Sequence, residues 1–229
     1  VDRLSDIQVN AMFGSVLEAR FVSALTNHPA LVVTKHMVNG KPGYWIGMPG
    51  EEAGAPMWEL EPQVMLGSAQ GVAIQTEADF VLRPVRLADR QQLGEWVLYL
   101  DGFGPHHPIQ TDDTRKRMAV LRSGRRVWTL TWHDLPSAGT KPDSVNETYL
   151  TSHRSPQWLQ AYDKLAERFG WSLTGKLDEL IEIGPYGVLI RLLTLPTATL
   201  SQLHELPIAL AIGWLHKPSL EAKLLDSID

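Results

Sequence analysis

The chain has 229 residues and a formal net charge of −5; hydrophobic residues make up 44% of it and charged residues 21%. These values are ordinary for a globular protein, and the net acidity argues against a free-standing protein that coats nucleic acid. The absence of cysteine excludes disulfides and thiolate metal sites and favours the cytoplasm.

Neither a membrane span nor a signal peptide is predicted. The longest uncharged apolar run, at 207–215, is far shorter than the roughly 20 residues that a membrane span needs. The chain begins at Val1 without a Met, so we expect it to be a piece of a longer polypeptide.

The first half of the chain predicts helix and strand in alternation, from apolar periodicity and turn residues. The predicted elements are, in chain order, a helix from Ile7 to Ala24, strands at 31–38 and 43–48 around an Asn39-Gly40 turn, strands at 58–66 and 72–85, an exposed connection at 86–94, a strand at 96–101, a helix at 111–123 ended by Gly124, and a strand at 127–132. The helix at 111–123 is expected to form a β-α-β crossover.

The second half has a different character. Pro, Ser, Gly and Thr dominate 135–148 and predict a loop or linker. A helix is predicted at 156–169, and a strand-like run follows at 188–195 within an otherwise helical region. We therefore divide the chain into a core at 1–134, a linker at 135–155 and a mostly helical extension at 156–229.

Two aspartates lie in the predicted strands. Asp79 lies within one strand, and Asp101 ends another on the face it shares with Tyr99. If the two strands pair as an antiparallel hairpin, both carboxylates converge on one site. Two alternatives remain open: Asp79 pairs with Arg83 as a structural carboxylate, or Asp101 belongs to an Asp-Gly turn.

A histidine and a basic helix follow the second carboxylate. His106 stands after a Gly-rich turn, and histidine suits a general base because its ordinary pKa lies near neutral pH. Residues 112–126 hold six cations against two acids, which predicts a phosphate-facing patch or, equally well, a solvated helix face. The nucleic-acid-binding candidates are Arg115, Lys116, Arg117, Arg122 and Arg126.

The order of these motifs resembles the PD-(D/E)XK nuclease superfamily, and within it the very-short-patch-repair-type endonucleases. The resemblance covers roughly 15–132 and rests on four short stretches: E-A-D-F, V-L-Y-L-D-G-F-G-P-H, D-T-R-K-R-x-x-x-L and G-x-x-V-W. The stretch W-E-L-E-P-Q-V-x-L-G resembles domains attached to DEAD/DEAH-box helicases, including those of bacterial anti-phage systems. The resemblance implies a restriction-endonuclease-like mixed sheet flanked by helices, an α/β (α+β) fold.

The resemblance also assigns roles. Asp79 matches the metal-binding aspartate, His106 the histidine base, and Glu18 the helix acid that positions metal or water. Tyr99 stands where many members carry the Glu of the E-x-K motif, and Asp101 stands in place of its Lys. The implied metal is Mg²⁺, with Mn²⁺ as substitute, held by Asp79 and Asp101 with waters. Lys116 or Arg117 would hold the phosphate.

Two functions of different class follow. The first is a Mg²⁺-dependent DNA endonuclease-like domain that works with a helicase in DNA processing or phage defence. The second is a catalytically degenerate nuclease fold that serves as a DNA-binding or protein-docking module, with Tyr99 marking the lost acid.

Overall fold

The computed structural model describes residues 15–50, 56–101, 110–136, 156–170, 177–197, 199–200, 202–203 and 205. The chain divides into two compact units, Val1–Gly139 and Thr140–Asp229. Within the described residues, no helix is both long and apolar enough to cross a membrane.

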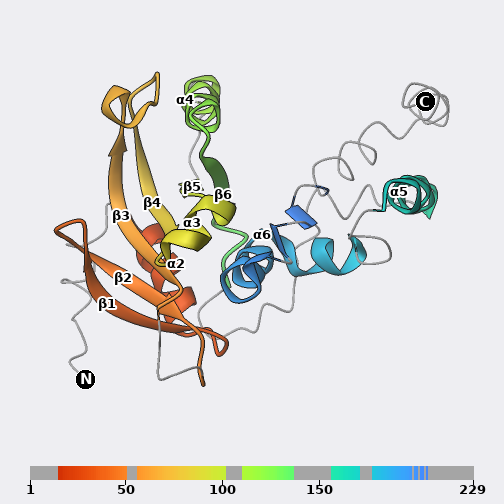
Figure 1. Ribbon diagram of the computed structural model, residues 1–229, viewed down its shortest axis with the longest axis horizontal. Helices are drawn as coiled ribbons and strands as arrows, with labels where there is room; N and C mark the ends of the chain where they lie inside the picture. The colour runs from red at the N-terminus through yellow and green to blue at the C-terminus, as the bar shows by residue number, and fades with distance from the viewer. Residues whose placement is uncertain are drawn as a thin grey trace. The chain divides into compact units, whose positions relative to one another are not determined.

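The first unit is built on a six-stranded sheet with helices beside it (Figure 1). Its elements are α2 (Val16–Thr26), β1 (Val32–Val38), β2 (Lys41–Gly47), β3 (Trp58–Leu66), η2 (Ser68–Gln70), β4 (Thr76–Pro84), α3 (Leu87–Leu93), β5 (Trp96–Asp101), α4 (Gln110–Arg122) and β6 (Arg126–Thr131). The strands lie side by side in chain order, antiparallel from β1 to β5, and β6 runs parallel to β5. The predicted mixed sheet flanked by helices is therefore confirmed.

Local sequence signals account for the start of this unit. The Ser15 hydroxyl accepts a hydrogen bond from the backbone N–H of Glu18 at 3.2 Å and caps α2. Asn39 and Gly40 both have positive φ, 49° and 78°, as a tight two-residue turn between β1 and β2 requires.

Two helices cover opposite faces of β4. The Phe80 ring lies 5.2 Å from the Phe21 ring of α2. Val81, the next residue, belongs instead to an apolar cluster with Ala119 and Val120 of α4. Because successive strand residues point to opposite faces, α2 and α4 lie on opposite sides of the sheet at this strand.

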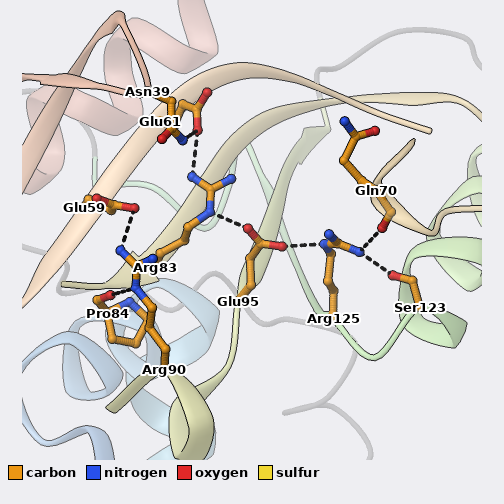
Figure 2. A network of polar contacts seen from close by, with 10 residues as sticks. All are labelled: Asn39, Glu59, Glu61, Gln70, Arg83, Pro84, Arg90, Glu95, Ser123 and Arg125. Carbon is orange, nitrogen blue, oxygen red and sulfur yellow. Dashed lines mark hydrogen bonds and ion pairs between the residues drawn. The ribbon is translucent and has the colours of Figure 1, made fainter. Parts of the chain in front are cut away.

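A network of hydrogen bonds and ion pairs around Arg83 of β4 connects neighbouring strands (Figure 2). The Arg83 guanidinium donates to the Glu61 carboxylate of β3 at 2.6 Å and to the Glu95 carboxylate just before β5. Glu95 also accepts from Arg125, which precedes β6. Four strands are thus joined through two arginines and two carboxylates.

Three sequence predictions differ from the structure. The strand predicted at 72–85 is shorter, because β4 runs only from Thr76 to Pro84. The predicted connection at 86–94 is mostly exposed, as expected, but it contains the short helix α3, in which only Leu93 is buried and after which Gly94 has φ 67°. The strand-like run at 188–195 lies mostly within helix α6 (Leu177–Thr194).

The second unit is described mainly as two helices, α5 (Pro156–Phe169) and α6. The start of α5 at Pro156 is as predicted. In α6, Gly184 has φ 65° and breaks the helix, and Pro185 begins the next helical stretch. The apolar run after Pro185 is buried on nearly every side, which is why its pattern does not distinguish helix from strand.

Gly43 supplies a first stability test, because β2 passes close to its neighbours there. A Cβ at Gly43 would lie 2.8 Å from the Leu60 carbonyl oxygen and 3.0 Å from Val38 Cγ2. We expect Gly43→Ala to lower the free energy of unfolding by about 1–3 kcal/mol, the usual cost of overpacking. Gly67→Ala is the matched control, since its Cβ would meet nothing closer than 4.0 Å. Equal effects of the two changes in urea unfolding would contradict this packing.

Candidate active site

Asp79 lies where the pairing between β4 and β5 stops. The register between the two strands ends with Phe80 opposite Leu98. One residue further along, the Asp79 carboxylate accepts a hydrogen bond from the backbone N–H of Leu100 at 2.7 Å. The Asp79 side chain thus takes the place of a backbone acceptor for β5, just beyond the last paired residues of the two strands.

The pairing with β3 is also distorted beside Asp79. Pro62 lies opposite Phe80 and Val64 opposite Ala78, but Gln63, which falls between them, adopts φ 51° and leaves the ladder. A left-handed backbone in a non-glycine strand residue costs of order 1–3 kcal/mol and is concentrated at functional sites.

The distortion connects Gln63 to helix α2. The Gln63 amide donates to the Glu18 carboxylate at 2.6 Å, and Glu18 is only 2% exposed. Glu18 therefore sits close enough to Asp79 for their charges to interact. Glu18 does not line the cavity that contains Asp79, because α2 lies on the opposite side of the sheet from α4 at β4.

The environment of Asp79 favours its protonated form. Burial raises the pKa of the Asp79 carboxyl to about 6, and the negative charges of Glu18 and Asp101 act in the same direction. The hydrogen bond from Leu100 works against them. Negative charge is therefore in excess at this end of the sheet, and a cation placed here would relieve it.

A polar cavity of about 260 Å³ opens at this point between β4, β5 and α4. It is lined by Thr76, Glu77, Asp79, Tyr99, Asp101, Asp113, Lys116 and Arg117. Four of these side chains are carboxylates and two are cations, so the lining carries a surplus of two negative charges when all are ionised. We call it the acidic cavity.

Helix α4 supplies the cations of the acidic cavity. The Arg117 guanidinium binds the Asp101 carboxylate at 2.5 Å and lies over the Tyr99 ring, 5.1 Å from its centre. Lys116 pairs with Asp112 one turn earlier, at 2.6 Å. The Arg117 Nε is buried and has no hydrogen-bond partner within the described structure.

Tyr99 stands in the cavity wall where the resemblance implies an acid. Its hydroxyl lies 3.3 Å from the Thr76 hydroxyl, and burial raises its pKa. At neutral pH it is therefore an uncharged group that donates or accepts a hydrogen bond but supplies no negative charge to a metal.

The structure places the other predicted site residues as follows. Asp79, Asp101, Lys116 and Arg117 line one cavity. Arg115 and Arg122 line a different groove on α4. His106 lies outside the described residues.

Arg126 lies away from both. Its guanidinium donates to the carbonyl oxygen of Leu93 and rests 5.3 Å from the centre of the Trp96 ring. These contacts hold α3 and the start of β6 together.

The two aspartates have different partners in the structure. Arg83 binds Glu61 and Glu95, while Asp79 accepts from the Leu100 backbone, so the Arg83-paired role does not describe Asp79. Asp101 ends β5 opposite Thr131. The sequence reasoning missed Gln63, Glu77 and Asp113 in this region; for Asp113, its position one turn before Arg117 on a predicted helix was a usable signal.

The two predicted metal ligands, Asp79 and Asp101, both line the acidic cavity. In the described part of the chain, no three His, Asp or Glu side chains are grouped as metal ligands. Mg²⁺ tolerates this, because it keeps several waters and is commonly held by one or two carboxylates plus substrate phosphates. Asp79 and Asp101 are the carboxylates that would hold it.

The chain matches none of the family models, curated proteins or solved structures with which it was compared. Its function must therefore be argued from the acidic cavity and the motifs that form it.

Proposed function

We propose that the first unit is a Mg²⁺-dependent DNA endonuclease-like domain that acts beside or within a helicase in DNA processing or phage defence. The observation that carries the proposal is Asp79: a half-buried carboxylate with a raised pKa, in a cavity with surplus carboxylates and two cations. The helicase context rests on the sequence resemblance.

In the proposed reaction, the carboxylates of the cavity would bind the metal ion and its cations would bind phosphate. When bound, Mg²⁺ would polarise the phosphodiester and offset its negative charge. Lys116 and Arg117, the two cations that line the cavity, would hold phosphate oxygens. Glu18, fixed by Gln63, keeps the Asp79 carboxylate in a negative environment that favours cation binding.

One observation favours the second function, a degenerate nuclease fold that binds DNA without cutting it. Arg117 forms an ion pair with Asp101, one of the two predicted metal ligands, and Tyr99 contributes no negative charge. The same cavity would then bind a phosphate through Arg117 and Lys116 without metal-assisted cleavage.

The test is DNA cleavage by the full chain with supercoiled plasmid and with short single- and double-stranded DNA, in Mg²⁺, Mn²⁺ or EDTA. We expect metal-dependent nicking that Asp79→Asn reduces by at least about 100-fold, since metal-assisted charge stabilisation contributes several kcal/mol to such reactions. Glu59→Gln is the matched control. Glu59 lies on β3 outside the cavity and pairs with Arg90 of α3.

The other outcomes are equally informative. DNA binding with a steep salt dependence but no cleavage in either metal selects the degenerate module. Cleavage that persists in EDTA or in Asp79→Asn rejects the metal site. A chain that neither binds nor cuts DNA at low salt rejects both functions.

A further inference from the structure

A second concave surface lies on α4, distinct from the acidic cavity. It has a volume of about 400 Å³ and is formed where the segment between β3 and β4 lies against α4. Its lining consists of Gly71, Ala73, Ile74, Thr114, Arg115, Met118, Ala119, Arg122 and Ser123. We call it the α4 groove.

The floor of the α4 groove is apolar and reaches the surface. Ile74 is 39% exposed and Met118 is 42% exposed, and Ala73 and Ala119 line the groove beside them. Large apolar side chains that are exposed together at a hollow are a common mark of a contact surface.

Two arginines flank this floor. Arg115 and Arg122 are seven residues apart on α4 and therefore lie on one side of the helix, about 10 Å from each other along its axis. Both are exposed, and neither side chain makes an ion pair or hydrogen bond among the described residues. The neighbouring cations Lys116, Arg117 and Arg125 are all paired with carboxylates.

The lining favours a protein segment over nucleic acid. Proteins that hold single-stranded nucleic acid combine cations with aromatic rings on which bases stack. The α4 groove is lined by aliphatic, small and polar side chains and by Met118, with no aromatic ring. Unpaired cations around an aliphatic floor complement acidic residues around an aliphatic side chain.

We propose that the α4 groove is a docking site for an acidic amphipathic helix of a partner protein, with one or two aliphatic side chains on the groove floor and acids two turns apart on Arg115 and Arg122. The inference goes beyond the proposed nuclease function and stands without it, because α4 presents different residues to the groove and to the acidic cavity.

The test uses the full chain and a fluorescein-labelled helical peptide in which two leucines lie between glutamates seven residues apart. We expect saturable binding, with shifts of the methyl NMR signals of Ile74 and Met118 and no shift of Met65, which is exposed outside the groove. The double change Arg115→Glu and Arg122→Glu should weaken binding at least about tenfold, because two attractions become repulsions. A peptide with serines in place of the leucines should bind at least about tenfold more weakly.

Arg86→Glu is the matched control. Arg86 is exposed and lies outside the groove, and its reversal makes the same charge change as either single reversal within the groove, so binding should stay within about twofold. The variants are first compared by circular dichroism to show that they fold.

Several results would overturn the proposal. They are no binding of the peptide, binding that the double variant leaves unchanged, or an equal loss in Arg86→Glu. A single-stranded oligonucleotide that shifts the Ile74 and Met118 methyls in place of the peptide would assign the groove to nucleic acid. Concentration-dependent dimerisation that the double variant abolishes would assign it to a second copy of the chain.

Discussion

Arg83→Met is expected to be the most destabilising single change in the polar network, lowering the free energy of unfolding by about 3–5 kcal/mol. The Glu61 side chain is only 6% exposed and binds Arg83 at 2.6 Å. Burial alone would lower the pKa of the Arg83 guanidinium, but Glu95 and Glu61 raise it overall. The two carboxylates therefore stabilise the charged form of Arg83. Its removal leaves a buried carboxylate with no cation.

Arg90→Met is the matched control in the same network (Figure 2). Arg90 pairs with Glu59 at 3.2 Å, and its side chain is 42% exposed, so solvent screens the pair. Arg90 Nε also donates to the Pro84 carbonyl oxygen at 2.7 Å, so its loss should cost about 1–2 kcal/mol, less than that of Arg83. Urea unfolding followed through the indole NMR signals of Trp58 and Trp96, both buried in the first unit, measures both variants.

A rescue variant separates charge from packing. Adding Glu61→Gln to Arg83→Met removes the carboxylate charge that has lost its cation. In the parent chain the Asn39 amide donates to Glu61 at 2.8 Å, and the glutamine oxygen can accept the same hydrogen bond. We expect the double variant to be more stable than Arg83→Met alone. If Arg83→Met and Arg90→Met cost the same, the network does not stabilise the sheet in the way inferred here.

The strands and helices around the site could be predicted because their patterns are long and regular. The predicted bounds 58–66 and 96–101 match β3 and β5, and the helix predicted at 111–123 is α4, one residue earlier. Period-two alternation also places Asp79 and Val81 on the same strand face. Helix α3 was missed because seven residues with one buried side chain give too short a pattern.

The finer features of the site could not be predicted, because they depend on contacts between distant elements. Gln63 leaves the β3 ladder and reaches Glu18, 45 residues away in sequence, and no local signal marks its positive φ. The pairing of Arg117 with Asp101 depends on where α4 packs. A pattern indicates which residue types face one side; which cation meets which carboxylate is decided by tertiary packing.

Asp79→Asn should make the folded protein more stable at neutral pH while removing its proposed activity. The pKa of Asp79 is about 6 in the folded chain and 3.8 as its ordinary value, so the folded state binds the proton more tightly. Stability contributed by this group is therefore full below pH 4, falls as the pH rises from about 4 to 6, and is lost above pH 6. The shift corresponds to about 3 kcal/mol.

Asparagine resembles the protonated carboxyl and can still accept from Leu100, so Asp79→Asn should lack this fall between pH 4 and 6. At pH 4 the variant and the parent chain should be about equally stable, and at pH 7.5 the variant should be more stable by up to about 3 kcal/mol. Urea unfolding at a series of pH values measures the difference. The ¹³C chemical shift of the Asp79 carboxyl reports its pKa directly.

Magnesium links this stability effect to the proposed function. A cation that binds the Asp79 carboxylate favours its ionised form, so Mg²⁺ should lower the pKa of Asp79 and stabilise the parent chain at pH 7.5. Asp79→Asn should show little stabilisation by Mg²⁺, and Glu59→Gln should respond as the parent does. If Asp79→Asn is less stable than the parent at pH 7.5, Asp79 is a structural carboxylate whose ionised form the fold requires, and the acidic cavity is not poised for a cation.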